Sequence, residues 1–290
     1  MSPDRLLGRW LSARLEPEQA RWLEDCAARL RDQGSDRELY LAFSQVPRRL
    51  GKADLELKPE ELAEAARSRP GWDPGRWSLE QAARVYLLLS SKGDADDFAR
   101  RLERLCSAAD IGELVALYQG LPLYPDPPRH ALRAAEGVRS NMRAVFEAVA
   151  HRNPYPAEQF PEQAWNQMVL KALFVGSPLA PIVGLAERAN PALAAMLRDY
   201  AHERWAASRP VSPELWRCVG PFASGEALED FKRLLAKGGE LDRLAAALAL
   251  DASADPAAAA LLDSTGALAE SVRQARVSWE SLGAQLAAEQ

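Results

Sequence analysis

Histidine, cysteine and long apolar runs are scarce in this sequence, and the scarcity of cysteine and of apolar runs each excludes a class of protein. The chain has 3 histidines and 3 cysteines in 290 residues. Cys26, Cys106 and Cys218 lie far apart without a Cys-x-x-Cys pair, which excludes a zinc ribbon or a disulfide framework and favours reduced thiols of a cytoplasmic protein. No run of about 18 apolar residues occurs, so we expect no membrane-spanning helix.

An excess of basic charge is also missing. The sequence has 36 lysines and arginines against 41 acidic residues, a net charge of -5, and no basic stripe that follows a phosphate backbone. Nucleic acid is therefore not an expected partner. Gly-rich phosphate loops, the Gly-x-Ser-x-Gly elbow and the His-Glu-x-x-His helix are absent as well, so no common reaction chemistry is indicated.

The sequence contains many residues that are typical of helices and of helix starts. Apolar residues recur at three- and four-residue spacing, and no stretch alternates between apolar and polar over the length of a strand. Four prolines are placed to be the first residue of a helix, where the missing N–H would have no partner within the helix: Pro59, Pro191, Pro213 and Pro256. Two serines precede Glu or Gln by three residues, as in a capping box: Ser35 and Ser78. The sequence predicts an all-α fold, either an irregular multi-helix bundle or a short superhelical, HEAT-like stack, with no β-sheet.

Composition suggests how the chain is divided. We expect a helical core domain over residues 1–222 and an alanine-rich C-terminal helical extension over residues 223–290 that packs on it. The first segment is amphipathic, with Arg5, Arg9 and Arg14 on its polar side. Such a helix packs on its own core or lies on a membrane surface.

Residues 130–205 carry polar groups in three consecutive helical segments. In the first, over residues 131–149, Arg139 and Asn141 flank one continuous apolar stripe, so we expect them to be at least half covered. In the second, over residues 165–175, only Asn166, Gln167 and Lys171 are polar, which predicts a central helix. A buried Lys171 must meet a carboxylate, extend to solvent, or face a cavity that holds a ligand.

The third segment contains Asp199, His202 and Glu203. Asp-x-x-His on one helical face is half of a carboxylate–histidine metal site, and His151 at the end of the first segment would complete a set of His151, Asp199 and His202 for a divalent metal. A hydrogen bond between Asp199 and His202 explains the same spacing without a metal. No other cofactor is indicated.

Eight blocks in this order resemble the EboA domain family: residues 37–43, 51–55, 134–142, 153–156, 165–174, 188–191, 199–207 and 212–217. The resemblance spans about residues 35–222, with the N-terminal helix and the tail less specific. It implies a bacterial operon protein associated with the making or export of a secondary-metabolite precursor, beside a membrane prenyltransferase and sugar-phosphate-type enzymes. It implies no catalytic residue.

Three hypotheses follow. The first is a binding or hand-over protein with a metabolite pocket between helices, in the cytoplasm or peripheral at the inner membrane. Arg139 and Lys171 would hold a polar end and Trp165 and Tyr155 would cover the apolar part. The full predicted site is Arg139, Asn141, Tyr155, Trp165, Asn166, Gln167, Lys171 and Asp199. The second is an enzyme with His151, His202 or Glu203 as acid or base, with or without a metal. The third is an adaptor that docks the prenyltransferase through the N-terminal helix or the tail.

Overall fold

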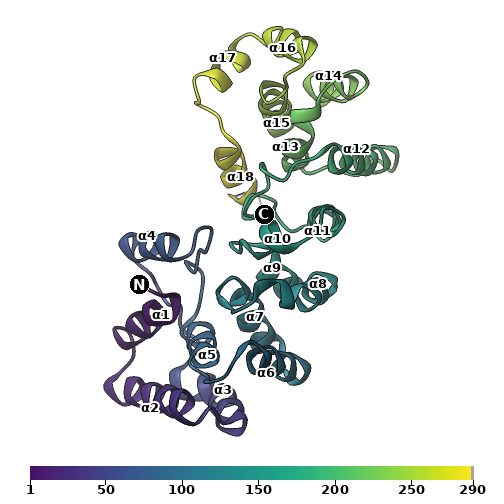
Figure 1. The fold of residues 1–290 in the computed structure, drawn as a ribbon. Coiled ribbons are helices and arrows are strands. Elements are labelled where there is room, and N and C mark those ends of the chain that lie inside the picture. Colours follow the sequence, from purple (N-terminus) through teal and green to yellow (C-terminus); the bar gives the residue numbers. More distant parts are fainter. Residues whose placement is uncertain (289–290) are drawn as a thin grey trace. The chain divides into compact units, whose positions relative to one another are not determined.

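The computed structural model describes residues 1–288, which form eighteen α-helices and four short 3-10 helices (Figure 1). These residues contain no strand, and the bridge between Asp54 and Ser78 is isolated. The prediction of an all-α fold without a sheet is confirmed for this part of the chain. Contacts divide the chain into an N-terminal unit, Met1–Pro161, and a C-terminal unit, Glu162–Gln290.

The N-terminal unit is a two-layer stack. Its helices are α1 (Pro3–Ser12), α2 (Pro17–Gln33), α3 (Asp36–Leu50), α4 (Pro59–Ser68), α5 (Leu79–Leu89), α6 (Ala95–Ala108), α7 (Ile111–Gln119), η1 (Leu121–Leu123), η2 (Pro127–His130), α8 (Ala131–Arg139), α9 (Arg143–Ala150) and α10 (Tyr155–Gln159). Helices α3, α5, α7 and α9 pack in succession, while α2, α6 and α8 cover α3, α7 and α9. Within this unit the arrangement is the stack that helices joined by short turns favour.

Helix α5 is the centre of that stack. Ser78 caps it, because the Ser78 Oγ accepts from the N–H of Gln81 while the Gln81 side chain accepts from Ser78 at 2.8 Å. The helix is buried almost all round, including its charges. Arg84 donates to Glu80 at 3.0 Å, which compensates the cost of burying both groups.

The amphipathic first helix has no free apolar face. Leu6, Leu7, Trp10 and Leu11 are at most 2% exposed, and α1 packs on α5. A membrane surface could take up these side chains only if α1 left its place. None of the helices in residues 1–288 is long and apolar enough to cross a bilayer.

The continuous helix predicted over residues 131–149 is wrong. Helix α8 ends at Arg139 and α9 begins at Arg143. Ser140 takes extended backbone angles (φ -56°, ψ 141°), and its Oγ accepts from the Met142 N–H at 3.1 Å. Such a local side-chain bond competes with the helical pattern, so the apolar stripe changes direction at this point.

The C-terminal unit is a bundle around one helix. Its helices are α11 (Glu162–Phe174), α12 (Pro191–Ala206), η3 (Pro213–Leu215), α13 (Trp216–Val219), η4 (Gly220–Phe222), α14 (Ala227–Lys237), α15 (Glu240–Asp251), α16 (Pro256–Asp263), α17 (Ala267–Arg273) and α18 (Trp279–Ala288). Helices α13, α14, α16, α17 and α18 all pack on α15 (Figure 1). The short helix η4 also packs on α15. Its first residue must be small, since a Cβ at Gly220 would lie 2.6 Å from the carbonyl oxygen of Ala249.

The four helix starts predicted from prolines are confirmed, at α4, α12, η3 and α16. The separate extension predicted after residue 222 stays a prediction. Contacts divide the chain after Pro161, and α13 and η4, which end no later than residue 222, pack on α15, which follows that residue.

Candidate functional site

Arg139 and Asn141, which the sequence predicted to be at least half covered, both fall among the exposed residues. Arg139 is the last residue of α8, and Asn141 lies in the break before α9. The expectation assumed one straight helix, and the extended Ser140 removes both residues from the flank of the apolar stripe.

Tyr155 lies inside the N-terminal unit. Its side chain is fully buried, its hydroxyl donates to the carbonyl of Pro127, and burial raises its pKa. His151 follows α9, is half-buried, and donates its N–H to the carbonyl of Glu147 at 2.8 Å. Tyr155 therefore holds the chain around η2 in place.

Two of the predicted residues on α11 are structural. Trp165 is 0% and Asn166 3% exposed. The guanidinium of Arg188 lies 4.9 Å from the ring centroid of Trp165. Asn166 exchanges side-chain hydrogen bonds with Asn190 at 3.2 and 2.9 Å, and Asn190 caps α12. The Asn166 amide thus joins α11 to the start of α12.

The outer side of α11 is not buried as predicted. Gln167 is exposed, and Phe174 is 78% exposed. Lys171 is half-buried, and burial lowers its pKa. The helix is therefore covered on one side only, which corrects its prediction as a central helix.

His202 has a different partner from the one that the Asp199 spacing suggested. Its Nε2 lies 2.6 Å from Oδ1 of Asp230 on α14, and Arg198 donates Nε to the other carboxylate oxygen at 2.7 Å. Asp230 is 7% exposed, whereas Asp199, His202 and Glu203 are exposed. Among residues 1–288 no group of three or more histidine, cysteine or acidic side chains is placed to hold a metal. The set of His151, Asp199 and His202 therefore has no support as a metal site.

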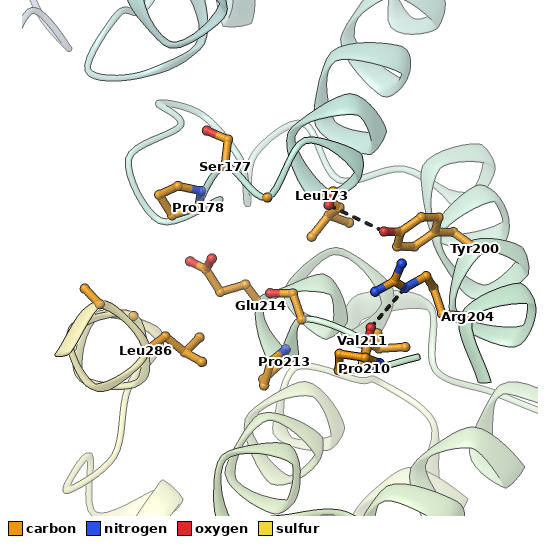
Figure 2. A pocket seen from close by; sticks show the side chains of 14 residues that line it. Leu173, Ser177, Pro178, Tyr200, Arg204, Pro210, Val211, Pro213, Glu214 and Leu286 are labelled. Atoms are coloured by element: carbon orange, nitrogen blue, oxygen red, sulfur yellow. Dashed lines mark hydrogen bonds between the residues drawn. The ribbon is translucent and has the colours of Figure 1, made fainter. Parts of the chain in front are cut away.

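A pocket of about 300 Å³ opens within the C-terminal unit (Figure 2). We call it the α12 pocket. Four segments form its walls: the end of α11 and the following turn, one face of α12, residues 210–214, and α18. The residues that line it are Leu173, Gly176, Ser177, Pro178, Tyr200, Arg204, Pro210, Val211, Ser212, Pro213, Glu214, Gly283, Leu286 and Ala287. Its walls are mainly apolar, with few polar groups, as in many small-molecule sites.

Tyr200 and Arg204 form the polar wall. They lie one helical turn apart and so share a face of α12. Arg204 donates Nε to the carbonyl of Pro210 at 3.0 Å, and the Tyr200 hydroxyl lies 3.4 Å from the carbonyl of Leu173. Figure 2 shows the guanidinium reaching from α12 toward the hollow. The Nε bond fixes the plane of the guanidinium and leaves its terminal nitrogens to donate.

Glu214 forms the opposite wall. It is 6% exposed, and its two carboxylate oxygens accept from the N–H groups of Leu179 and Ala180 at 2.9 and 2.7 Å. These bonds satisfy the buried charge and hold the turn after α11. Gly283 lets α18 approach that turn, since a Cβ there would lie 3.1 Å from the Cβ of Ala180.

None of the predicted site residues lines this pocket. The nearest in sequence, Asp199 and Glu203, each lie next to a lining residue of α12 but are exposed. The four-residue spacing of Tyr200 and Arg204 indicates in the sequence that they share one face of α12. The prediction used the spacing of Asp199 and His202 on the same helix instead, and these lie on another face. Glu214 carries no local signal, because its partners are backbone amides about 35 residues away.

A family model described as "Metabolite traffic protein EboA" matches residues 4–220 of the chain. The match begins within α1, further toward the N-terminus than the resemblance over residues 35–222 indicated. It includes Tyr200, Arg204 and Glu214, and it ends before α18. Comparison with curated proteins and with solved structures gave no match.

Proposed function

Because this chain belongs to the EboA family of metabolite traffic proteins, we propose that it binds a small metabolite in the α12 pocket and releases it chemically unchanged. In this proposal it carries a precursor or intermediate of a bacterial secondary-metabolite pathway through the cytoplasm and hands it to a membrane prenyltransferase. The pathway and the acceptor rest on the family resemblance alone.

The observation that carries the binding proposal is the position of Arg204. Its guanidinium faces a pocket whose other walls include Leu173, Val211 and Leu286 (Figure 2). Arginine suits a carboxylate or another planar acceptor, and the aliphatic walls suit an apolar body. The ligand class is therefore a small amphipathic molecule with one acidic end.

The chemistry of the walls favours binding over catalysis. Both oxygens of Glu214 accept backbone N–H groups, so this carboxylate has a structural role in holding the turn after α11. The catalytic candidates lie elsewhere: His202 bonds to Asp230, and Glu203 and His151 do not line the pocket.

The proposal is tested by calorimetric titration with octanoate and with octanamide, which has the same chain without the charge. We expect the parent to prefer octanoate. Arg204→Gln removes a hydrogen bond to a charged group, worth about 1.5 kcal/mol or more, so octanoate should bind roughly tenfold more weakly while octanamide binding is unchanged.

Arg243→Gln is the matched control, because Arg243 is an exposed arginine of the same unit that does not line the pocket. It removes the same charge and should leave both affinities unchanged. Equal weakening in the two variants, or a parent that binds neither compound, would contradict the proposal.

A further inference from the structure

A second hollow shares the lining residues Pro210 and Val211 with the α12 pocket. It measures about 260 Å³, and we call it the basic groove. Its lining residues are Trp205, Arg209, Pro210, Val211, Arg233, Leu234, Lys237, Gly238 and Asp242. They come from the end of α12, the segment after it, the last turns of α14 and the start of α15.

Three cations converge on this groove without a carboxylate partner. Within the described part of the chain, Arg209, Arg233 and Lys237 form no ion pair, whereas Arg198 and Arg217 of the same unit do. One acid lines the groove, Asp242, and its Oδ2 accepts from the Gly239 N–H at 3.0 Å at the start of α15. The groove therefore has a surplus of positive charge that no internal acid neutralises.

The aromatic residues beneath the groove fix one of these cations. The Arg233 guanidinium lies 4.2 Å from the ring centroid of Trp205. Trp205 in turn stacks on the fully buried Trp216, with ring centroids 5.6 Å apart and an angle of 22°. A guanidinium on an aromatic face keeps its N–H edges free, so it is oriented before an acceptor arrives.

A backbone turn places the residue that carries a second cation at the groove. Ser208 has a left-handed φ of 54°, and the Arg209 N–H donates to the carbonyl of Arg204 at 2.8 Å. The chain reverses there and brings Arg209 to the groove beside Arg233 and Lys237. Two guanidinium groups and one ammonium group around a small hollow match an oxyanion with several acceptor atoms.

We propose that the basic groove binds a phosphate group, with Arg233, Arg209 and Lys237 donating to its oxygens. This site is separate from the α12 pocket, since Arg233 and Lys237 do not line that pocket. The phosphate group can belong to a soluble small molecule or to a lipid head group, and the two sources are distinguished by experiment.

The test is calorimetric titration of the full chain with inorganic diphosphate at low ionic strength. The variant Arg233→Gln/Lys237→Gln removes two charges from the groove, and we expect diphosphate to bind at least roughly tenfold more weakly. The control variant Lys232→Gln/Arg243→Gln removes two charges from exposed residues outside the groove, and its affinity should change less than twofold.

Co-sedimentation with phosphatidylglycerol vesicles, with phosphatidylcholine vesicles as reference, is the second arm of the test. Vesicle binding that the groove variant loses and the control variant keeps identifies a lipid head group, and diphosphate binding alone identifies a soluble ligand. Equal losses in both variants indicate diffuse surface charge and overturn the proposal, as does a parent that binds neither probe.

Octanoate titration of the groove variant serves as the check on folding. Unchanged octanoate affinity means that the C-terminal unit is intact. Loss of diphosphate binding with octanoate binding retained separates this site from the α12 pocket. If the parent does not bind octanoate, the thermal unfolding midpoint of each variant replaces this check.

Discussion

At the scale of single residues, Asp230 of α14 is the acid that bonds to two side chains of α12. It is buried and accepts from both Arg198 and His202. We predict that Asp230→Ala lowers the free energy of unfolding by roughly 1–3 kcal/mol, because two charged or polar partners lose their acceptor. This range is below that for a fully buried pair, since the His202 side chain is 48% exposed. Urea denaturation measures the loss.

Asp199→Ala is the comparison, because Asp199 is the acid that the sequence paired with His202. Its side chain is exposed, so its removal should change stability by no more than about 0.5 kcal/mol. A larger loss for Asp199→Ala than for Asp230→Ala would restore the original pairing. The sequence left a metal site and an Asp199–His202 hydrogen bond as alternatives, and the acid that bonds to His202 is set by how α14 packs beside α12.

Glu61 makes a pH-dependent contribution to the stability of the N-terminal unit. Hydrogen bonds from Arg14, one of them 3.1 Å long, hold the pKa of Glu61 below its ordinary value of 4.5. A carboxylate with a lowered pKa stabilises the fold above that ordinary value, and the effect is lost as pH falls through the folded-state pKa. We predict that Glu61→Gln costs up to about 1 kcal/mol at pH 7 and less at pH 3.

Urea midpoints of the parent and of Glu61→Gln at the two pH values measure this difference. Glu60→Gln is the control, since Glu60 is an exposed neighbour in the first turn of α4. A stability gap between parent and Glu61→Gln that is as wide at pH 3 as at pH 7 would mean that packing, and not charge, explains the role of Glu61.

At the scale of helices, Gly137 sets the approach of α8 to its neighbours. A Cβ at this position would lie 2.7 Å from Cγ2 of Val149 and 2.9 Å from the ring of Tyr118. Alanine favours a helix over glycine by about 1 kcal/mol, but overpacking costs roughly 1–3 kcal/mol. We therefore predict a net loss of stability in Gly137→Ala, measured by thermal unfolding.

Gly112→Ala should behave in the opposite way. Its Cβ would meet only the side chain of Asp110, at 3.4 Å, so helix propensity alone should raise stability, by about 0.5 kcal/mol. If both variants gain stability, the close approach of α8 to α7 and α9 is not as described.

Helix boundaries were predictable where the signal is local. Proline at α4, α12, η3 and α16 marks a start in the sequence itself, since the missing N–H has no partner in a first turn. The break at Ser140 was not predictable from periodicity, because the apolar spacing continues through it. The close contact of Gly137 with Val149 requires α8 and α9 to be separate helices, and this is a tertiary effect.

At the scale of the whole molecule, the site could not be read from the sequence because its walls come from distant segments. Leu173 and Leu286 lie near the two ends of the sequence of the C-terminal unit, and residues 210–214 supply a further wall of the same pocket. The sequence predicted buried polar groups on adjacent helices, but two that are buried bond within the protein: Asn166 to the side chain of Asn190, and Tyr155 to the carbonyl of Pro127. Polar groups within a helical region therefore directed the prediction to residues 130–205, whereas much of the lining of the α12 pocket comes from residues 210–214 and from α18.

A crystal structure of the protein with octanoate bound tests directly whether the α12 pocket (Figure 2) holds an acidic amphipathic ligand. We expect density for the carboxylate within hydrogen-bonding distance of the terminal nitrogens of Arg204, with the alkyl chain against Leu173, Val211 and Leu286. Under the same conditions, crystals of Arg204→Gln should show no ordered carboxylate there. An empty α12 pocket in the parent, or octanoate held in the same position by the Gln variant, would mean that Arg204 does not bind the ligand as proposed.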